Sequence, residues 1–420
     1  MKRKTPFLLP AVLIMSFVLS ACAGLLPQDN DPVTGDFGSL YTPQEHQTRT
    51  FDALWKNIQD NYIYFDSADM DWDALYTKYT SRIDGGLTDD QFTTLLHELE
   101  DELPAGTITY QSREERIETD IGINSSYGGI GAFIGFQAEP IPHIVILAVM
   151  EGSPAEKAGI KAHDSLLEID GTPILLEEGI MAVQRVRGPA GTNVELTIRS
   201  PGKAERAVNV TRAQLSSTGR LEAYEIQDTQ YGYILIPPIV YEGLVDELIA
   251  NLRIFTTNKT LKGLILDLRV AGSSRGWPLE ELFTMFHDGE IGEFYNRSDQ
   301  QTATITGQDL FGTQEVPLII LVGENTTGFP EILAGSLQAY ERATIIGGTT
   351  PGTIETTTTY HLPDGSRVFI ATTSFRLPNG GDIGNNGVRP NFQIEAGWDD
   401  ILPNNDPVLD KAIEVLEAQK

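Results

Sequence analysis

Two threonine hydroxyls stand where an apolar run gives way to a helical pattern. Thr326 and Thr327 precede Glu331–Tyr340, whose apolar residues recur at helical spacing. A helix N-terminus suits nucleophilic chemistry, because its free N–H groups and its dipole favour negative charge. Ser273 and Ser274 add two hydroxyls in a loop that follows another apolar run. Loops also use such hydroxyls to satisfy their own backbone groups, so residue type alone does not establish a nucleophile.

A general base is harder to identify than a hydroxyl. His287 and His361 are candidates, but no carboxylate partner can be recognised for either histidine. The six histidines are scattered without metal-ligand spacing, and no calcium-binding loop is present. We therefore expect no metal and no cofactor. The paired aspartates are better explained as charges at helix N-termini: Asp71, Asp73, Asp89 and Asp90.

The first residues indicate export. A basic start is followed by the mostly apolar stretch Phe7–Leu19, which is too short to span a membrane, and then by Leu19-Ser20-Ala21-Cys22. This ending predicts a lipoprotein signal peptide over 1–21, with the lipid on Cys22. The alternative is an ordinary secretory signal with a stray cysteine. Cys22 is the only cysteine of the chain. We expect an exported protein on the periplasmic or extracellular face of a bacterial membrane, held by a lipid anchor.

Composition limits the class of partner. The formal net charge of the 420-residue chain is −29, which argues against nucleic acid and against electrostatic docking on anionic lipid. With 40% hydrophobic and 8% aromatic residues, the chain is typical of a globular protein of two or three domains. We interpret the acidity as a source of solubility.

Periodicity divides the mature chain into three regions after a Pro- and Gly-rich tether. Capping patterns and apolar stripes predict helices in the first region, short β-rich runs fill the second, and continuous apolar runs alternate with helical patterns in the third. The expected fold class is a multidomain α/β protein. The expected regions are a tether over 22–41, a helical region over 42–119, a β-rich domain with two helices over 120–213, and an α/β core over 214–420.

The second region resembles a PDZ domain. The resemblance lies in Tyr127-Gly128-Gly129-Ile130-Gly131 and in the longer block from Gly152 to Gly171. It implies that N–H groups of a loop hold a peptide carboxylate, that the strand carrying Phe136 pairs with the peptide, and that a helix forms the other wall. The implied peptide-binding residues are Gly129, Ile130, Gly131, Ala132, Phe136, Ile180 and Val183. The alternative is a PDZ domain that only packs against the core.

In order and in motifs, the whole mature chain resembles the C-terminal processing (tail-specific) serine peptidases. The resemblance rests on Leu266-Asp267-Leu268-Arg269, Glu331-Ile332-Leu333-Ala334-Gly335, Gly387-Val388-Arg389-Pro390-Asn391 and Asp406-Pro407-Val408-Leu409. It implies a core of the ClpP/crotonase-like type. It also implies a Ser/Lys hydrolysis, in which a neutral Lys amine takes the proton of a Ser that attacks a peptide carbonyl.

The residues at the family's reactive positions depart from the pattern. The position of the Ser, three residues before Glu331, holds Gly328; that of the Lys holds Thr353; and that of a supporting Gln holds Thr357. In the family's Asp-Leu-Arg-x-Asn-x-Gly-Gly segment the Asn is replaced by Ala271 and the glycines by serines. A shift of one residue would place Thr327 at the site, so Thr327 is the fallback nucleophile.

Two functions follow from these residues. One is a catalytically inactive homologue that binds polypeptide C-termini or unfolded envelope proteins through its PDZ domain, as an adaptor or as a regulator of an active paralogue. The other is an active serine-type endopeptidase of divergent mechanism that processes or degrades envelope proteins. A third and weaker possibility is a structural lipoprotein without a peptide ligand.

Overall fold

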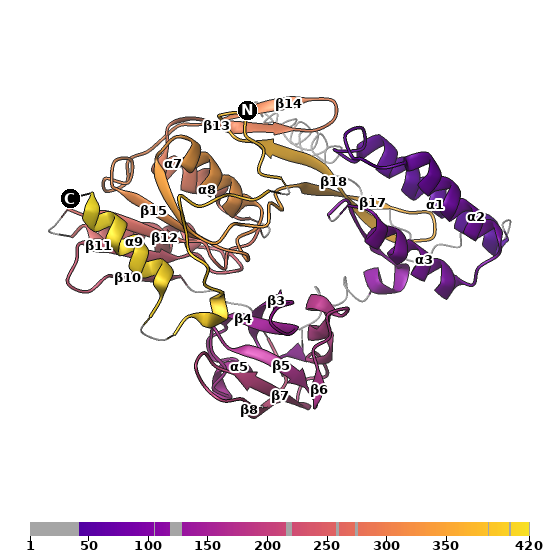
Figure 1. Cartoon of the computed structure of the whole chain (residues 1–420), viewed down its shortest axis with the longest axis horizontal. Coiled ribbons are helices and arrows are strands. Elements are labelled where there is room, and N and C mark those ends of the chain that lie inside the picture. Colours follow the sequence, from indigo (N-terminus) through magenta and orange to yellow (C-terminus); the bar gives the residue numbers. More distant parts are fainter. Residues whose placement is uncertain are drawn as a thin grey trace, which may run out of the picture.

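A computed structural model describes residues 42–419 except 105, 118–127, 216–220, 258–259, 274–275, 385 and 403–404. Three parts are arranged as an arch, with an α/β core at one end, a helical region at the other, and a small β-rich domain below (Figure 1). The predicted signal peptide, the tether and Cys22 lie outside the described residues. None of the described helices is both long and apolar enough to cross a bilayer.

Three amphipathic helices open the described chain: α1 (Pro43–Asn61), α2 (Trp72–Asp84) and α3 (Asp89–Glu102). Thr42 and Thr88 close the capping boxes predicted for α1 and α3, and the Asp71 side chain caps α2. The helices do not bury their apolar faces against one another alone, because their core also contains Val368 and Ile370 from a strand almost 300 residues later in the chain. The helical region is thus a cap on a sheet rather than a free-standing bundle.

That sheet has five strands, which come from distant parts of the sequence. They are β1 (Ile108–Gln111), β13 (Gly289–Tyr295), β14 (Gln300–Ile305), β17 (Thr356–His361) and β18 (Arg367–Arg376). In the ten-residue strand β18, residues 367–370 pair with β1, residues 367–373 pair with β17, and residues 374–376 pair antiparallel with β13. β18 therefore joins the helical region to the core.

The β-rich domain contains two small sheets. Its strands are β2 (Gly128–Gly129), β3 (Ala132–Gln137), β4 (His143–Val149), β5 (Ser165–Ile169), β6 (Thr172–Pro173), β7 (Asn193–Arg199), β8 (Arg206–Thr211) and β9 (Ala213–Gln214). The main sheet has the order β3-β4-β5-β7-β8, so β3 lies at one end and its outer edge has no strand partner among the described residues. The short helix α5 (Pro154–Lys157) and the 3₁₀ helix η1 (Gly179–Arg185) complete the domain.

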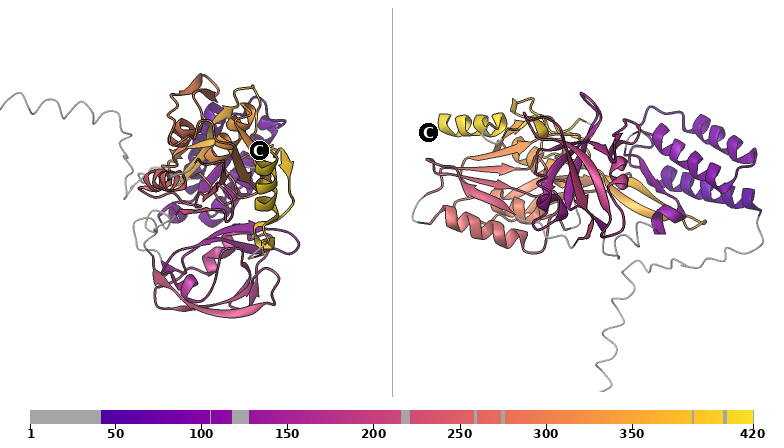
Figure 2. Two further views of the ribbon diagram at one scale, coloured as in Figure 1. Left: turned by 90° about the vertical axis from the view of Figure 1, so that its left-hand side faces the viewer. Right: turned by 90° about the horizontal axis from the view of Figure 1, so that it is seen from below.

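The core is a six-stranded sheet between two layers of helices. Its order is β10-β11-β12-β15-β16-β19, formed by β10 (Glu222–Glu225), β11 (Tyr231–Leu235), β12 (Gly263–Asp267), β15 (Leu318–Val322), β16 (Ala343–Gly347) and β19 (Phe392–Gln393). All neighbours after β10 are parallel, as the continuous apolar runs predict. The helices α6 (Leu244–Phe255), α7 (Leu279–Phe286) and α8 (Phe329–Ala339) pack on one face, and α9 (Pro407–Ala418) packs on the other (Figure 2).

One buried arginine ties the sheet to its last helix. Arg269 follows β12 and donates to the carboxylate of Asp267, and it also reaches both oxygens of Asp406, the N-cap of α9, at 3.0 and 2.7 Å. Asp406 in turn accepts hydrogen bonds from the first amides of α9. Two of the sequence segments that suggested the family thus meet in one ion-pair network.

Candidate active site

A fully buried carboxylate organises the loops at the start of α8. Glu331 accepts hydrogen bonds from Gly328 N (2.8 Å), Thr350 Oγ1 (2.5 Å), Gly352 N (2.6 Å) and Thr353 N (3.0 Å). Burial raises the pKa of Glu331, and the hydrogen bonds from Thr350 and the three amides partly offset that rise. The carboxylate therefore holds residues 328 and 353 next to one another, as the resemblance implies for a nucleophile and its base.

Gly328 occupies the expected nucleophile position, and the structure leaves no room there for a side chain. It is the N-cap of α8 with φ of 74°, a conformation that favours glycine. A Cβ atom at this position would lie 2.7 Å from Ser273 Cβ and would collide with Ser273 Oγ. The Ser273 hydroxyl accepts a hydrogen bond from Phe329 N at 2.6 Å. A hydroxyl is thus present at the helix N-terminus, but it comes from the neighbouring loop.

Four amides around Gly328 are satisfied within the protein. Thr327 N donates to Ala271 O at 3.1 Å, and Ser273 N donates to Thr327 O at 3.0 Å. Phe329 N donates to the Ser273 hydroxyl, and Gly328 N donates to Glu331. An oxyanion hole needs N–H groups aimed at the reacting oxygen and free to bind it. None of these four amides is free.

The expected base position also lacks a group that can accept a proton. Thr353 points its hydroxyl at Glu331 Oε2, 3.4 Å away, and Thr357 lies in the exposed strand β17. Lys262 precedes β12, whereas the 328 and 353 loops follow the C-terminal ends of parallel strands, so Lys262 lies at the opposite edge of the sheet. His287 bonds to Glu290 O and stacks on Tyr340.

The two threonine candidates differ in their surroundings. The Thr326 side chain is buried, donates to Leu268 O and accepts from Gly323 N, each at 2.9 Å, so it holds two loops together. Thr327 is half-buried and lines a cavity of about 410 Å³ between the core and strand β3. That cavity's described lining contains no lysine and no histidine. Ser274 lies outside the described residues.

The predicted peptide groove lies between β3 and η1 in the β-rich domain. β3 carries Ala132 and Phe136 and lies beside η1, which carries Ile180 and Val183. Ile180 is 41% exposed, and Val183 packs against the interior of the domain. The predicted carboxylate loop precedes β3: Gly129 pairs with Ala213, Ile130 is buried, and Gly131 has φ of 80°.

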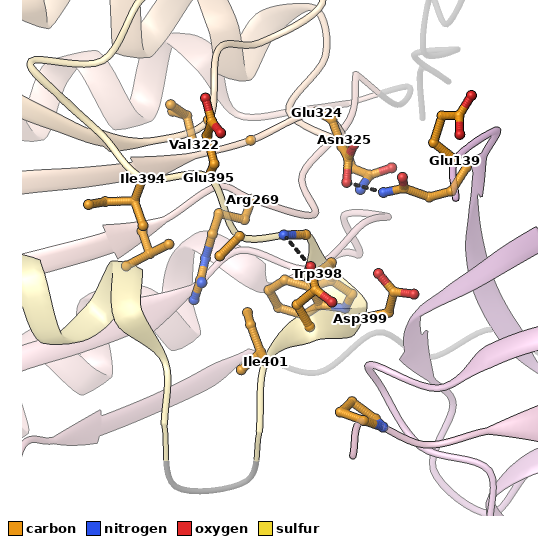
Figure 3. Close-up of a pocket in the computed structure, with 18 of the residues that line it drawn as sticks. Glu139, Arg269, Val322, Glu324, Asn325, Ile394, Glu395, Trp398, Asp399 and Ile401 are labelled. Carbon is orange, nitrogen blue, oxygen red and sulfur yellow. Dashed lines mark hydrogen bonds between the residues drawn. The ribbon is translucent and has the colours of Figure 1, made fainter. Parts of the chain in front are cut away.

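The β-rich domain also contacts the loop that leads to Gly328. Asn325 Oδ1 lies close enough to β3 that a Cβ atom at Gly135 would approach it to 2.5 Å. The Gln137 side chain donates to Glu324. Glu324 and Asn325 line both the cavity at Thr327 and a larger one of about 920 Å³, shown in Figure 3. Strand β3 therefore lies against the loop that leads to the expected nucleophile position.

Three family profiles match the chain in the order of its three regions. The profile of the Tricorn protease C1 domain matches residues 43–100, that of the PDZ domain matches residues 145–200, and that of Peptidase family S41 matches residues 230–394. The chain belongs to the PDZ-containing C-terminal processing peptidase family. This confirms the family and the fold class expected from the sequence.

Curated relatives of this family member span most of its length. The carboxyl-terminal-processing protease of Synechocystis sp. is 27% identical over 349 residues, 81% of this chain and 79% of that protein. A second, from Picosynechococcus sp., is 32% identical over 270 residues, 61% and 63% of the two chains. The alignment with the carboxy-terminal processing protease CtpB of Bacillus subtilis, 26% identical, covers 68% of this chain but only 59% of CtpB.

Solved structures confirm the fold. The photosystem II D1 C-terminal processing protease aligns with a TM-score of 0.64 at 22% identity, covering 90% of this chain and 98% of that one. A putative peptidase from Parabacteroides merdae aligns with a TM-score of 0.56 at 14% identity, covering 89% and 98%. Among the residues that the structure describes, no cluster of three potential metal ligands occurs.

Sequence reasoning missed the role of Ser273 in this family member. The sequence carries a signal for it: a glycine replaces the family's Ser at 328, and a serine replaces a family glycine at 273. In the structure, the Ser273 side chain occupies the space in which a side chain at position 328 would lie. Glu331 was recognised only as a motif residue, and its role in joining two loops required coordinates.

Proposed function

We propose that this protein is a catalytically inactive, PDZ-containing member of the C-terminal processing peptidase family that binds polypeptide C-termini. The observation that carries the proposal is the occupied site at the start of α8. Gly328 has no side chain, the Ser273 hydroxyl fills the adjacent space, and four amides around it are already bonded. No serine side chain fits without a change at residue 273.

The PDZ arrangement of strand β3 beside η1 supports the proposal of peptide binding. The unpaired outer edge of β3 can pair with an extended peptide, while apolar side chains on η1 supply the opposite wall. The loop from Gly129 to Ala132 precedes β3, where its N–H groups would receive a C-terminal carboxylate. The domain that would hold the tail contacts the loop leading to Gly328, because Asn325 approaches Gly135 in β3.

We further propose an envelope lipoprotein, lipidated at Cys22, with unfolded envelope proteins or the tails of other polypeptides as ligands. An active paralogue is a further proposed partner, because an inactive member that binds C-termini would compete for the same tails. Labelling with radioactive palmitate tests the anchor. Cys22→Ser should abolish incorporation, and incorporation that persists in this variant would refute lipidation at Cys22.

Peptidase activity is tested on the soluble chain from Ala23 onward. The parent, Thr327→Ala, and the triple variant Ser273→Gly/Gly328→Ser/Thr353→Lys are incubated with unfolded casein, and fragments are read by mass spectrometry. The parent should be inert. The triple variant is the informative comparison, because Gly328→Ser/Thr353→Lys alone leaves Ser273 in the way.

Cleavage by the parent that is lost in Thr327→Ala would overturn the proposal in favour of the second candidate, an endopeptidase with a threonine nucleophile. The cavity that Thr327 lines is the observation favouring this alternative. Cleavage by the triple variant but not by the parent would support loss of activity by residue replacement on an intact scaffold.

Tail binding is tested by fluorescence polarisation with labelled peptides that end in apolar residues, with a free carboxylate or an amide. We expect the free carboxylate to bind more tightly and Ile180→Asp to weaken binding at least tenfold. Ile254→Asp is the control, because Ile254 is also an exposed apolar residue but lies on helix α6 of the α/β core. Equal binding of both peptide forms would contradict carboxylate recognition.

A further inference from the structure

The PDZ domain docks on the core through a short segment that includes η2 (Trp398–Asp400). Trp398 and Asp399 project from this segment between the core and the PDZ strands (Figure 3). On the PDZ side, β4 contributes His143 and β5 contributes Ser165, whose hydroxyl donates to Asp399 Oδ2 at 2.7 Å. An apolar cluster lies beside this polar contact and contains Val145, Leu147, Val270, Trp398 and Ile401.

Both ring nitrogens of His143 face oxygen acceptors. Nε2 lies 2.9 Å from Asp399 Oδ2, and Nδ1 lies 2.7 Å from the carbonyl oxygen of Ile141. A neutral imidazole carries one N–H and one lone pair, so one of its nitrogens would oppose an oxygen lone pair in this arrangement. The protonated ring donates to both acceptors. The His143 side chain is only 2% exposed, so water cannot take the place of either oxygen.

The charges around His143 come from three segments: η2, β7 and the loop after β15. Asp399 on η2 bonds to it directly, Arg199 on β7 opposes its positive charge, and Glu324 and Asp400 line the same cavity. Burial alone lowers the pKa of His143, but the hydrogen bonds to Asp399 and Ile141 outweigh burial and raise it above the ordinary value.

The pKa of a second histidine at the interface, His163, is shifted in the opposite direction. His163 donates a hydrogen bond from Nδ1–H to the carbonyl oxygen of Trp398, 2.6 Å away, and its ring packs on the Trp398 indole with 4.2 Å between the ring centroids. Burial lowers its pKa, with Arg269 acting in the same direction and Asp406 and Asp267 opposing it. Docking therefore favours a neutral His163 and a protonated His143.

We propose that His143 and His163 make docking of the PDZ domain on the core depend on pH, with the His143–Asp399 ion pair as its charged contact. The contribution of His143 to the free energy of docking is complete below the ordinary histidine pKa of about 6.5, and it is lost as pH rises toward the higher pKa of the docked His143. The His163 contribution falls as pH drops below about 6.5. Docking is therefore strongest around pH 6.5, and release of the PDZ domain on either side of that pH frees β3 from Asn325.

The test measures the distance between the two parts by fluorescence energy transfer from pH 5 to 9.5. Dyes are placed on Asn209→Cys in β8 and Ala250→Cys in α6, both exposed positions, in the chain from Ala23 onward, which contains no native cysteine. Above pH 6.5 the docking constant should fall by up to tenfold per pH unit until His143 is neutral. The transfer efficiency should therefore peak near neutral pH and decline on both sides.

Three variants separate the two histidines from general effects of pH. His143→Gln should remove the alkaline decline, and His163→Gln should remove the acid decline while the alkaline one remains. His287→Gln is the matched control, since His287 is a half-buried histidine of the α/β core outside the interface, and both limbs should persist in this variant. A flat profile in the parent, or an alkaline decline that survives His143→Gln, would overturn the proposal.

A direct measurement keeps the proposal testable if His143→Gln does not fold. Nitrogen NMR of the unaltered chain at pH 6.5 should show protons on both ring nitrogens of His143, and Asp399→Asn should shift its titration to lower pH. A singly protonated His143 ring at that pH would refute the proposal that a positively charged His143 stabilises docking. These readouts do not involve hydrolysis or peptide binding, so they stand apart from the proposed function.

Discussion

The Ser273–Gly328 contact can be tested as a double-mutant cycle of stability. Gly328→Ser places a side chain at φ of 74° and drives its Cβ into Ser273. We expect about 1–2 kcal/mol from the backbone conformation and about 1–3 kcal/mol from overpacking. Ser273→Gly alone removes the hydrogen bond to Phe329 N and should cost about 1 kcal/mol. In the double variant the overpacking disappears, so the two changes should couple favourably by about 1–3 kcal/mol.

The four proteins of this cycle are unfolded in urea and followed by circular dichroism, with the slope of each transition compared before free energies are subtracted. Ser336→Gly is a control for a buried serine on α8 that does not approach Gly328. Additive effects, or a Gly328→Ser variant within about 0.5 kcal/mol of the parent, would show that the loop relaxes without strain. The space around residue 328 would then not explain the loss of the serine.

Three further predictions concern buried charges. Glu331→Gln should lower the free energy of unfolding by about 2–4 kcal/mol, because the glutamine NH₂ group would face N–H donors that are now paired with the carboxylate. Urea unfolding measures this change, and a loss below about 1 kcal/mol would contradict the prediction. Arg269→Lys should cost about 2–4 kcal/mol by the same assay, since an ammonium cannot reproduce the paired contacts to Asp267 and Asp406, and an unchanged midpoint would refute that role. Burial raises the pKa of Asp406, but the hydrogen bond and charge of Arg269 outweigh burial and leave this pKa below its ordinary value. The ionised Asp406 therefore contributes stability above about pH 4, and this stability is lost as pH falls. Asp406→Asn should flatten the loss of stability below pH 4 in acid titrations, and an unaltered slope would contradict this.

Local patterns predicted much of the fold. The capping boxes at Thr42 and Thr88 and the Asp406-Pro407 helix start are short-range features, so residues a few positions apart are enough to recognise them. The continuous apolar runs of the core strands also predicted their parallel, doubly covered sheet. The regions given for these elements remain sequence-based predictions, and the boundary at 119–120 lies outside the described residues.

Long-range pairings could not be predicted in the same way. Nothing near Val368 indicates that its strand completes the core of helices more than 250 residues earlier. At the candidate site, the family resemblance implied that Gly328 and Thr353 lie together, and Glu331 joins their loops. The contact between Ser273 and Gly328, and that between His143 and Asp399, join residues 55 and 256 positions apart. Sequence periodicity carries no information at such separations.

The shared strand β18 bears on how the chain is made. Residues 43–102 are synthesised early, but the face that covers their helices includes Val368, Ile370 and Ala371. A polypeptide that emerges from its N-terminus must therefore keep an incomplete apolar surface until most of its length has been synthesised, a stage at which chains are prone to aggregate. In this protein, a strand from the last third of the chain completes the apolar core of the N-terminal helices. Truncation from the C-terminus should therefore destabilise these helices before it destabilises the PDZ domain.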